Sequence, residues 1–447
     1  MSSLGSPALG LRTDQYELTM LETSLHSGVA HRNAVFEVFT RDLPPHRPFG
    51  VACGQGRLAE LIGRFTFSPS DLDALGELGA LGKRSAAFLE NFSFSGSISC
   101  YAEGELFFPD SPVLTVEAPF GEGLLLETLI LSVLNHDSAV ASAALRMVIA
   151  ARGRRLIEMG SRRTHEDAAV AAARAAYVAG FDSTSNLEAA RRYGIPSAGT
   201  AAHALVLAHL DEAAAFAHQV ATLGPSTTLL VDTFDVESGI RNAVQAAGSA
   251  LGGIRIDSGD LWSAASQARK LLDSLGAPSA DIVLSGNLDE YAIDSLADAP
   301  VDAFGVGTSV VSGSGYPNVG FVYKLVAIED ADGKMVPVAK TSPAKVGHGG
   351  RKWAWRMLDD GGMATEEICF VGSRPERGDL EALGPPGGST RPLQAELISG
   401  GIGAEEYPGG LDAARSRVRT SLAELPGGTT SLAGSPLPVR MLNRTPG

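Results

Sequence analysis

The sequence predicts an α/β fold, in which a (β/α) barrel in the middle of the chain is flanked by an α+β domain built from both termini. Three observations lead to this prediction. Short apolar runs alternate with amphipathic segments in the middle of the chain, which is typical of a parallel sheet. The earlier segments show the two-residue alternation of antiparallel strands. The last part returns to strand-like text and then becomes rich in Gly, Pro and Ser.

The middle of the chain repeats a strand-turn-helix unit. The predicted helices cover residues 164–178, 211–223, 237–251 and 261–275, where apolar residues recur at helical spacing. The predicted strands are seven short apolar runs that end in polar or glycine-rich turns: "RRLIEMGSRR", "AYVAGFDSTSN", "YGIPSAGTAAH", "TLLVDTFD", "GIRIDSGDL", "DIVLSGNLDE" and "VDAFGVGTSVV". With "GFVYKLVAIE" or an earlier segment the units number about eight, which is close to a closed barrel. Active sites lie at the carboxyl ends of such strands, where the polar residues of this chain gather.

The flanking domain is expected to comprise residues 1–120 and 328–447, with the barrel between them at 121–327. Antiparallel strands are predicted in "AVFEVFTRDLPP", "GSISCYAEGELFF" and "VLTVEAPF", and again in "KMVPVAKTS" and "GRKWAWRMLDD". Residues 120–150 are predicted to form a helix that leads into the barrel.

Composition narrows the class of protein. The net charge of −15 over 447 residues argues against a nucleic-acid groove or an anionic membrane surface. No secretory signal is visible, and the longest apolar stretch, "GLLLETLILSVLNH", is interrupted by Glu127 and is too short to span a bilayer. Three scattered cysteines, Cys53, Cys100 and Cys369, fit neither a disulfide framework nor a zinc cluster. We therefore expect a cytoplasmic protein.

The densest candidate site is "GIRIDSGDL". Arg255, Asp257, Ser258 and Asp260 follow one another at the end of a strand, and Arg255 shares a face with Asp257. Two carboxylates beside an arginine suit a polyphosphate substrate, because the carboxylates organise Mg²⁺ and the guanidinium pairs with phosphate oxygens. The alternative is a surface loop whose Asp residues cap the next helix.

Two arginines, Arg162 and Arg163, stand directly before a predicted helix whose N-cap is Thr164, with Asp167 at the capping-box position. Cations at a helix N-terminus oppose the helix dipole unless an anion sits there. The pair therefore indicates an anionic ligand, and a solvated arginine pair is the alternative.

Other candidates follow neighbouring strands. Glycine and hydroxyl residues in "GFDSTSN", "LSGNLDEY" and "GVGTSVV" can offer backbone N–H groups to a phosphate. The residues singled out there are Ser183, Gly286, Gly307 and Thr308. In "GIPSAGTAAHALV", Thr200 and His203 stand at the same row of strand ends, which favours a reactive histidine over a core one. Near the N-terminus, Thr13 or Asp14 is expected to cap a helix whose first turn holds Tyr16, either exposed for stacking on a flat ligand or packed on the surface.

The ordered set of motifs resembles the nicotinate phosphoribosyltransferase family. The resemblance runs from residue 13 to about 326, with a weaker continuation in "VAKTSPAKVGHGGRKWAWRML", and it rests on "TDQYELTM", "EMGSRR", "GFDSTSN", "GTAAH", "VDTFD", "RIDSGDL", "SGN", "GVGTSVV" and "VYKLV". It implies an irregular barrel of the type II phosphoribosyltransferase kind with a flanking domain from both ends. It also implies a reaction that joins nicotinate to phosphoribosyl pyrophosphate in NAD biosynthesis, with release of pyrophosphate and coupled hydrolysis of ATP.

The resemblance also implies roles for single residues. Tyr16 and Phe181 match the aromatic clamp on the pyridine ring, and Tyr16 reaches a neighbouring subunit's site if the protein is a homodimer. Thr200 matches a nicotinate contact, whereas Arg255 and Thr308 match residues that hold phosphoribosyl pyrophosphate. His203 matches the histidine that ATP phosphorylates.

Several alternatives stay open at this stage. Nicotinamide phosphoribosyltransferase shares the Arg-x-Asp-Ser-Gly-Asp motif, but it has an acidic residue directly after the Gly-Thr, where this chain has Ala201. Quinolinate phosphoribosyltransferase has a related barrel without the N-terminal motif. A metal-dependent barrel lyase would use Asp257 and Asp260 as ligands, but no histidine–carboxylate cluster is evident to hold the metal. A barrel that only binds a metabolite is the remaining alternative.

Overall fold

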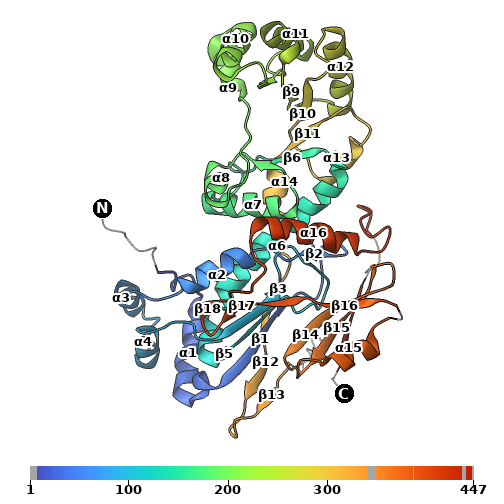
Figure 1. The fold of residues 1–447 in the computed structure, drawn as a ribbon. Helices are drawn as coiled ribbons and strands as arrows, with labels where there is room; N and C mark the ends of the chain where they lie inside the picture. The colour runs from blue at the N-terminus through green and yellow to red at the C-terminus, as the bar shows by residue number, and fades with distance from the viewer. Residues whose placement is uncertain (1–7, 341–348, 386, 435–438, 445–447) are drawn as a thin grey trace. The chain divides into compact units, whose positions relative to one another are not determined.

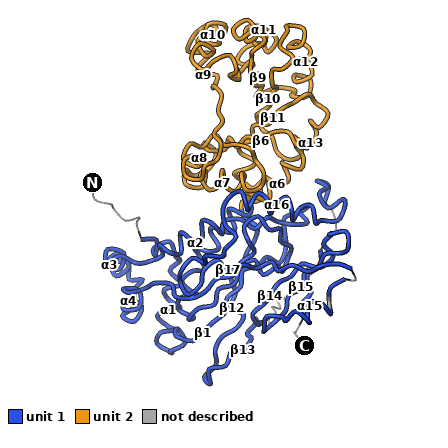
Figure 2. The backbone as a smooth tube through the Cα atoms, viewed as in Figure 1, with its two compact units in different colours: residues 1–139, 318–447 blue, residues 140–317 orange. Residues whose placement is uncertain are grey.

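The computed structural model describes residues 8–340, 349–385, 387–434 and 439–444. The chain forms two compact units, drawn in different colours in Figure 2: residues 1–139 with 318–447, and residues 140–317. The first unit is thus built from both ends of the chain, and the second is one continuous segment. Residues 341–348 of the weaker motif continuation lie outside the described residues.

The continuous unit holds a six-stranded parallel sheet in the order β7-β6-β11-β10-β9-β8, which curls into a half-barrel. Helices follow the strands along the chain, and α11 and α12 pack on β9 (Figure 1). Its strands are β6 (Arg155–Glu158), β7 (Ser183–Thr184), β8 (Thr228–Leu230), β9 (Gly253–Ile256), β10 (Asp281–Leu284) and β11 (Ala303–Val306). Its helices are α7 (Glu166–Ala179), α8 (Leu187–Tyr193), α9 (His203–His209), α10 (Glu212–Leu223), α11 (Val236–Ala247), α12 (Leu261–Ser274), α13 (Glu290–Ser295) and α14 (Thr308–Val311).

One strand prediction was wrong, and another predicted strand belongs to the other unit instead of the barrel. The segment 194–206 forms only an isolated bridge between Ser197 and Thr184, and helix α9 begins at His203. Pro196 and Gly199 are poor strand residues, which accounts for the difference. "GFVYKLVAIE" forms β12 (Val322–Glu329), but it pairs antiparallel with β1 in the other unit.

The unit built from both ends contains a seven-stranded sheet in the order β13-β12-β1-β5-β3-β17-β18. In this sheet, strands β1, β5 and β3 from the beginning of the chain are flanked by strands from its later part. β12 pairs with β1 at one edge of this group, and β17 pairs with β3 at the other. A four-stranded sheet, β16-β14-β15-β19, comes entirely from the C-terminal part. The strands of the two sheets are β1 (Asn33–Phe39), β3 (Ser97–Tyr101), β5 (Leu114–Pro119), β12, β13 (Met335–Pro337), β14 (Lys352–Leu358), β15 (Ala364–Val371), β16 (Ser389–Pro392), β17 (Gln394–Ser399), β18 (Ile402–Gly403) and β19 (Arg440–Arg444).

Helices and a two-stranded antiparallel sheet complete this unit: α1 (Gln15–Ser27), α2 (Gln55–Gly63), α3 (Pro69–Glu77), α4 (Lys83–Leu89), α5 (Phe120–Leu125), α15 (Arg377–Leu383), α16 (Leu411–Ala423) and the paired strands β2 (Gly50–Val51) and β4 (Leu106–Phe107). Helix α6 (Glu127–Ala151) runs from this unit into the other. It has 25 residues, more than the apolar stretch singled out in the sequence, and by length and composition only it is long and apolar enough to cross a membrane. However, 72% of its most apolar window is buried inside the protein, which is usual for a core helix.

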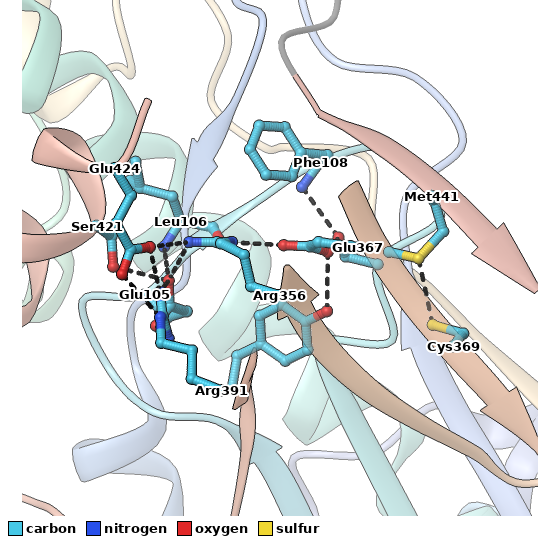
Figure 3. Close-up of polar contacts among 12 residues, drawn as sticks. Glu105, Leu106, Phe108, Arg356, Glu367, Cys369, Arg391, Ser421, Glu424 and Met441 are labelled. Carbon is cyan, nitrogen blue, oxygen red and sulfur yellow. Dashed lines mark hydrogen bonds and ion pairs between the residues drawn. The ribbon is translucent and has the colours of Figure 1, made fainter. Parts of the chain in front are cut away.

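A buried cluster of charges joins the two ends of the chain within this unit (Figure 3). Arg356 on β14 has no exposed side-chain surface, and its guanidinium donates to Glu105 (2.7 Å), Glu367 (2.5 Å) and Glu424 (3.2 Å). Arg391 on β16 donates to Glu105 and Glu424 as well. The two guanidinium groups offset the energetic cost of burying these carboxylates. Desolvation alone would raise the pKa of Glu105, but Arg356 and Arg391 lower it to about 2.

Candidate active site

Arg255 lies at the centre of the polar cluster in the continuous unit. It is the third residue of β9, between the fully buried Ile254 and Ile256, so its side chain points to the other face of the strand. Its Nη1 donates to the Thr200 hydroxyl (2.7 Å) and its Nε donates to the Ser285 hydroxyl (2.8 Å). With 13% of its side chain exposed, the guanidinium is largely buried and is held in place by these hydrogen bonds.

Asp257 and Ser258 follow β9 and are fixed by a carboxylate that the sequence reasoning did not select. Asp232 follows β8, its side chain is 2% exposed, and its Oδ2 accepts from the Asp257 backbone N–H (2.8 Å) and the Ser258 hydroxyl (2.9 Å). Asp257 Oδ1 accepts from the Ser285 hydroxyl (2.5 Å) and from Arg255 (3.3 Å). The end of β9 is therefore tied to the ends of β8 and β10.

His203 is the first residue of α9, and 41% of its side chain is exposed. Its Nδ1 lies 3.1 Å from the Thr233 hydroxyl, and its Nε2 lies 3.9 Å from Asp232 Oδ1. That Asp232 oxygen is buried, and no residue within the described part of the chain hydrogen-bonds to it. The imidazole therefore lies beside Asp232, the carboxylate that also fixes Asp257 and Ser258 of the Arg255 cluster.

The glycine and hydroxyl residues predicted as phosphate contacts also lie at strand ends. Gly286 follows β10 with φ +123°, and a Cβ there would lie 2.7 Å from the Asp257 carbonyl oxygen, so a side chain does not fit. Gly307 is the N-cap of α14 and Thr308 is the first residue of that helix. Ser183 begins β7, at the end of the sheet next to β6.

The structure does not bring all predicted residues to the Arg255 cluster. Phe181 is completely buried, so no face of its ring is exposed for a ligand in this conformation. Asp260 is exposed and caps α12, accepting from the Ser263 backbone N–H (3.2 Å). Arg162 and Arg163 are exposed in the loop between β6 and α7. The predicted N-cap Thr164 is wrong, because His165 caps α7 and its Nδ1 accepts from the Asp167 backbone N–H.

Tyr16 belongs to the unit built from both ends. It lies in the first turn of α1 with 43% of its surface exposed, after the N-cap Asp14. Its hydroxyl hydrogen-bonds Glu127, and partial burial together with the nearby carboxylates raises its pKa to about 12. The neighbouring Glu17 is buried and accepts from the Thr128 hydroxyl (2.6 Å). Burial raises the pKa of Glu17 to about 7.

The metal-binding capacity of the site is modest. Within the described residues, no three His, Cys, Asp or Glu side chains gather in a group that could hold a metal ion. Asp257 and Asp260 each use one carboxylate oxygen in the hydrogen bonds above and have a second oxygen to offer. Each carboxylate by itself suits a Mg²⁺ that keeps most of its waters and is held mainly by substrate phosphates.

A fixed guanidinium, a half-exposed histidine and close-fitting glycine turns at the carboxyl edge of a curled parallel sheet define an α/β-barrel enzyme for an anionic, phosphorylated substrate. Two family models match the chain: the nicotinate phosphoribosyltransferase N-terminal domain at residues 11–135 and the nicotinate phosphoribosyltransferase family at residues 154–354. The chain belongs to the nicotinate phosphoribosyltransferase family.

Individual relatives agree with this assignment. The chain is 51% identical to nicotinate phosphoribosyltransferase pncB1 of Mycobacterium tuberculosis, over 97% of this chain and 95% of that protein. It is 40% identical to nicotinate phosphoribosyltransferase of Bacillus subtilis, over 80% and 75% of the two chains. The crystal structure of human nicotinic acid phosphoribosyltransferase matches with a TM-score of 0.81 at 26% identity, covering 96% of this chain and 97% of that one.

Proposed function

We propose that this enzyme transfers the phosphoribosyl group of phosphoribosyl pyrophosphate to nicotinate, as a step of NAD biosynthesis. The pyridine nitrogen lone pair forms a bond to the anomeric carbon, and the bond from that carbon to the pyrophosphate oxygen breaks with its electron pair on pyrophosphate. The observation that supports this reaction most strongly is the 51% identity to a nicotinate phosphoribosyltransferase over nearly the whole chain.

Arg255 acts on the charge that develops on the leaving group. Its guanidinium is already held by the Thr200 and Ser285 hydroxyls, so little side-chain motion is lost when it pairs with phosphate oxygens. The nearly buried position strengthens that pairing relative to water. Backbone N–H groups near Gly286, Gly307 and Thr308 complete the proposed phosphate contacts. Mg²⁺, carried by the pyrophosphate and assisted by Asp257 and Asp260, would neutralise further charge when bound.

The arginine loop, defined here as residues 160–163, holds the base in this proposal. Arg162 or Arg163 pairs with the nicotinate carboxylate, and Ala201 after Thr200 adds no carboxylate that would repel it. Nicotinamide, which has no charge there, gains less from the arginines and finds no acidic acceptor at position 201. Nicotinate should therefore be the preferred base.

ATP enters the proposal through His203. An imidazole nitrogen forms a bond to the γ-phosphorus, the bond from that phosphorus to the β,γ-bridging oxygen breaks, and ADP leaves; later hydrolysis of the phosphohistidine restores the imidazole. Thr233 lies at hydrogen-bond distance from Nδ1, whereas Nε2 is 3.9 Å from Asp232 Oδ1, so Nε2 is the nitrogen that takes the phosphoryl group in this proposal. The added charge lies close to Arg255 and its hydroxyl partners, where it can influence the substrate site.

A homodimer is the proposed assembly. Leu205, Leu207 and Leu210 on and after α9 are exposed by 39%, 52% and 92%, and Phe234 after β8 is exposed by 63%. Apolar side chains gathered beside His203 are expected to be covered by a second copy of the chain. In such a dimer Tyr16 of one copy serves the site of the other.

Two experiments test these proposals. Pyrophosphate release is measured with nicotinate, nicotinamide or quinolinate, each with and without ATP, and nicotinate should give the fastest release and be stimulated by ATP. Equal or faster turnover of nicotinamide would overturn the choice of base. For the shared site, Tyr16→Ala and Arg255→Ala chains are co-expressed. Recovery of activity in the mixture supports a site built by two copies, and no recovery contradicts it.

A further inference from the structure

Glu158 is the last residue of β6, in the row of strand ends that carries the site, and it is 1% exposed. Strand β6 lies between β7 and β11, and Glu158 is in register with Thr184 on one side and Val306 on the other. Its side chain therefore stands among the loops that follow three neighbouring strands. The mechanism above makes no use of it.

Both carboxylate oxygens of Glu158 are engaged. Oε1 accepts from the Gly160 backbone N–H (2.5 Å), and Oε2 accepts from the Thr184 hydroxyl (2.5 Å). The Thr184 oxygen in turn accepts from the Asn186 backbone N–H (2.9 Å), and the Asn186 side chain donates to the Ser161 hydroxyl (3.1 Å). A closed set of hydrogen bonds thus runs from Glu158 through the loop after β7 and back to the arginine loop.

Gly160, the first residue of the arginine loop, has little room around it. A Cβ at Gly160 would lie 2.1 Å from Val311 Cγ1 and 3.0 Å from the Gly307 carbonyl oxygen. Gly160 is therefore packed against the segment that begins with the proposed phosphate contacts, and its carbonyl accepts from the Arg163 backbone N–H (2.8 Å). Glu158 fixes the position of Gly160 by one direct hydrogen bond. The position of Gly160 in turn determines where the backbone of Arg162 and Arg163 starts from the end of β6.

The surroundings of Glu158 are unusual for a buried acid. Among the residues that the structure describes, none with a positive charge pairs with it, and its partners are a backbone N–H and a hydroxyl. Burial accordingly raises the pKa of this carboxyl. A buried carboxylate held only by neutral donors costs stability, and an apolar residue at the end of β6 would avoid that cost.

We infer that Glu158 is a positioning residue that holds the arginine loop in register with the β7 and β11 loops, and so sets the preference of the enzyme for a base that carries a carboxylate. The inference rests on the proposed function, because it takes the anion at Arg162 or Arg163 to be the nicotinate carboxylate. Glu158 touches neither substrate in this account; it acts through Gly160 and Thr184.

The test is a set of variants on both sides of the hydrogen bonds. Glu158→Leu removes both acceptors, and Glu158→Gln keeps one. Thr184→Val removes the hydroxyl at nearly constant shape, and Thr184→Ser restores it. The kcat/KM for nicotinate should fall by about tenfold or more in Glu158→Leu and Thr184→Val, since a hydrogen bond to a charged group is lost. The KM for phosphoribosyl pyrophosphate should stay within about twofold, and Thr184→Ser should resemble the wild type.

The ratio of kcat/KM for nicotinate to that for nicotinamide separates positioning from simple loss of stability. A displaced arginine loop should lower this ratio, whereas a destabilised but correctly arranged enzyme should lose both activities in proportion. Glu290→Gln is the matched control, because Glu290 is equally buried (2% exposed) and pairs with Arg146. It should lower the melting temperature without changing the ratio.

The outcomes are distinguishable. An unchanged ratio in folded Thr184→Val and Glu158→Gln protein would overturn the inference, and so would an equal change in Glu290→Gln. Failure of the wild-type enzyme to use nicotinate would instead overturn the proposed function. If Glu158→Leu does not fold, the two Thr184 variants decide alone.

Discussion

Replacing Arg356 by Met tests the buried charge cluster. The substitution removes the guanidinium that pairs Glu105, Glu367 and Glu424. Glu105 and Glu424 keep Arg391, whereas completely buried Glu367 keeps, among the described residues, the Tyr101 and Ser111 hydroxyls alone. Breaking a buried pair from one side costs about 3–5 kcal/mol. For a unit of this size, that loss lowers Tm by roughly 6–20 °C.

Calorimetry and urea unfolding of the full chain measure the effect. Arg391→Met is the comparison variant, and it should cost about 1–3 kcal/mol because 27% of its side chain is exposed and water can replace part of its contacts. The double variant Arg356→Met/Glu367→Gln should be more stable than Arg356→Met alone, because it removes the orphaned charge. A loss below about 1 kcal/mol in Arg356→Met, or no recovery in the double variant, would refute the reasoning.

Four further predictions concern the site and the N-terminal motif. Arg255→Ala should lower kcat/KM for phosphoribosyl pyrophosphate roughly 30–150-fold, as loss of a desolvated guanidinium–phosphate contact of about 2–3 kcal/mol requires; unchanged kinetics in folded protein would remove Arg255 from the site. His203→Ala should take no acid-labile label from γ-labelled ATP and should keep a residual transfer that ATP no longer stimulates, whereas label on another histidine would contradict the assignment. Asp232→Asn should slow that labelling about tenfold, because the carboxylate facing the imidazole is lost; wild-type labelling would show that Asp232 does not assist. Glu17 has a pKa of about 7 in the folded protein and an ordinary value of 4.5, so the unfolded chain ionises first and stability should fall as pH rises from about 4.5 to 7, by up to about 3 kcal/mol. Glu17→Gln should abolish that fall, and an unchanged dependence of Tm on pH would contradict the assignment.

Sequence reasoning located the helices of the continuous unit well. The predicted ranges 164–178, 211–223, 237–251 and 261–275 became α7, α10, α11 and α12, each beginning and ending within a few residues of the prediction. Helical apolar spacing and the Asp and Gly residues at the ends carry this information locally. The prediction of a strand at 194–206 was wrong. An apolar segment before a polar turn occurs both in strands and in the loops that precede helices, and here it precedes α9.

The site was predictable only in part. Arg255, Asp257 and Ser258 stand together in one motif, and the hydrogen bonds to Thr200 and Ser285 follow from the meeting of strand ends at one edge. Asp232 and Glu158 were overlooked although both occur in motifs that were recognised. An acidic residue after a strand normally suggests an exposed helix cap, and burial of its carboxylate against loops far along the chain leaves no local trace in the sequence.

The discontinuity of the first unit has a consequence for its synthesis. When the ribosome has made residues 1–139, β1 and β3 still lack β12 and β17, their eventual neighbours at residues 322–329 and 394–399. At about 5–20 residues per second, the rest of the chain takes about 15–60 s to emerge. Residues 140–317 can fold during that interval, while the nascent N-terminal segment exposes unpaired strand edges and the unneutralised Glu105. We therefore expect a chaperone that shelters this segment during synthesis to raise the yield of correctly folded enzyme.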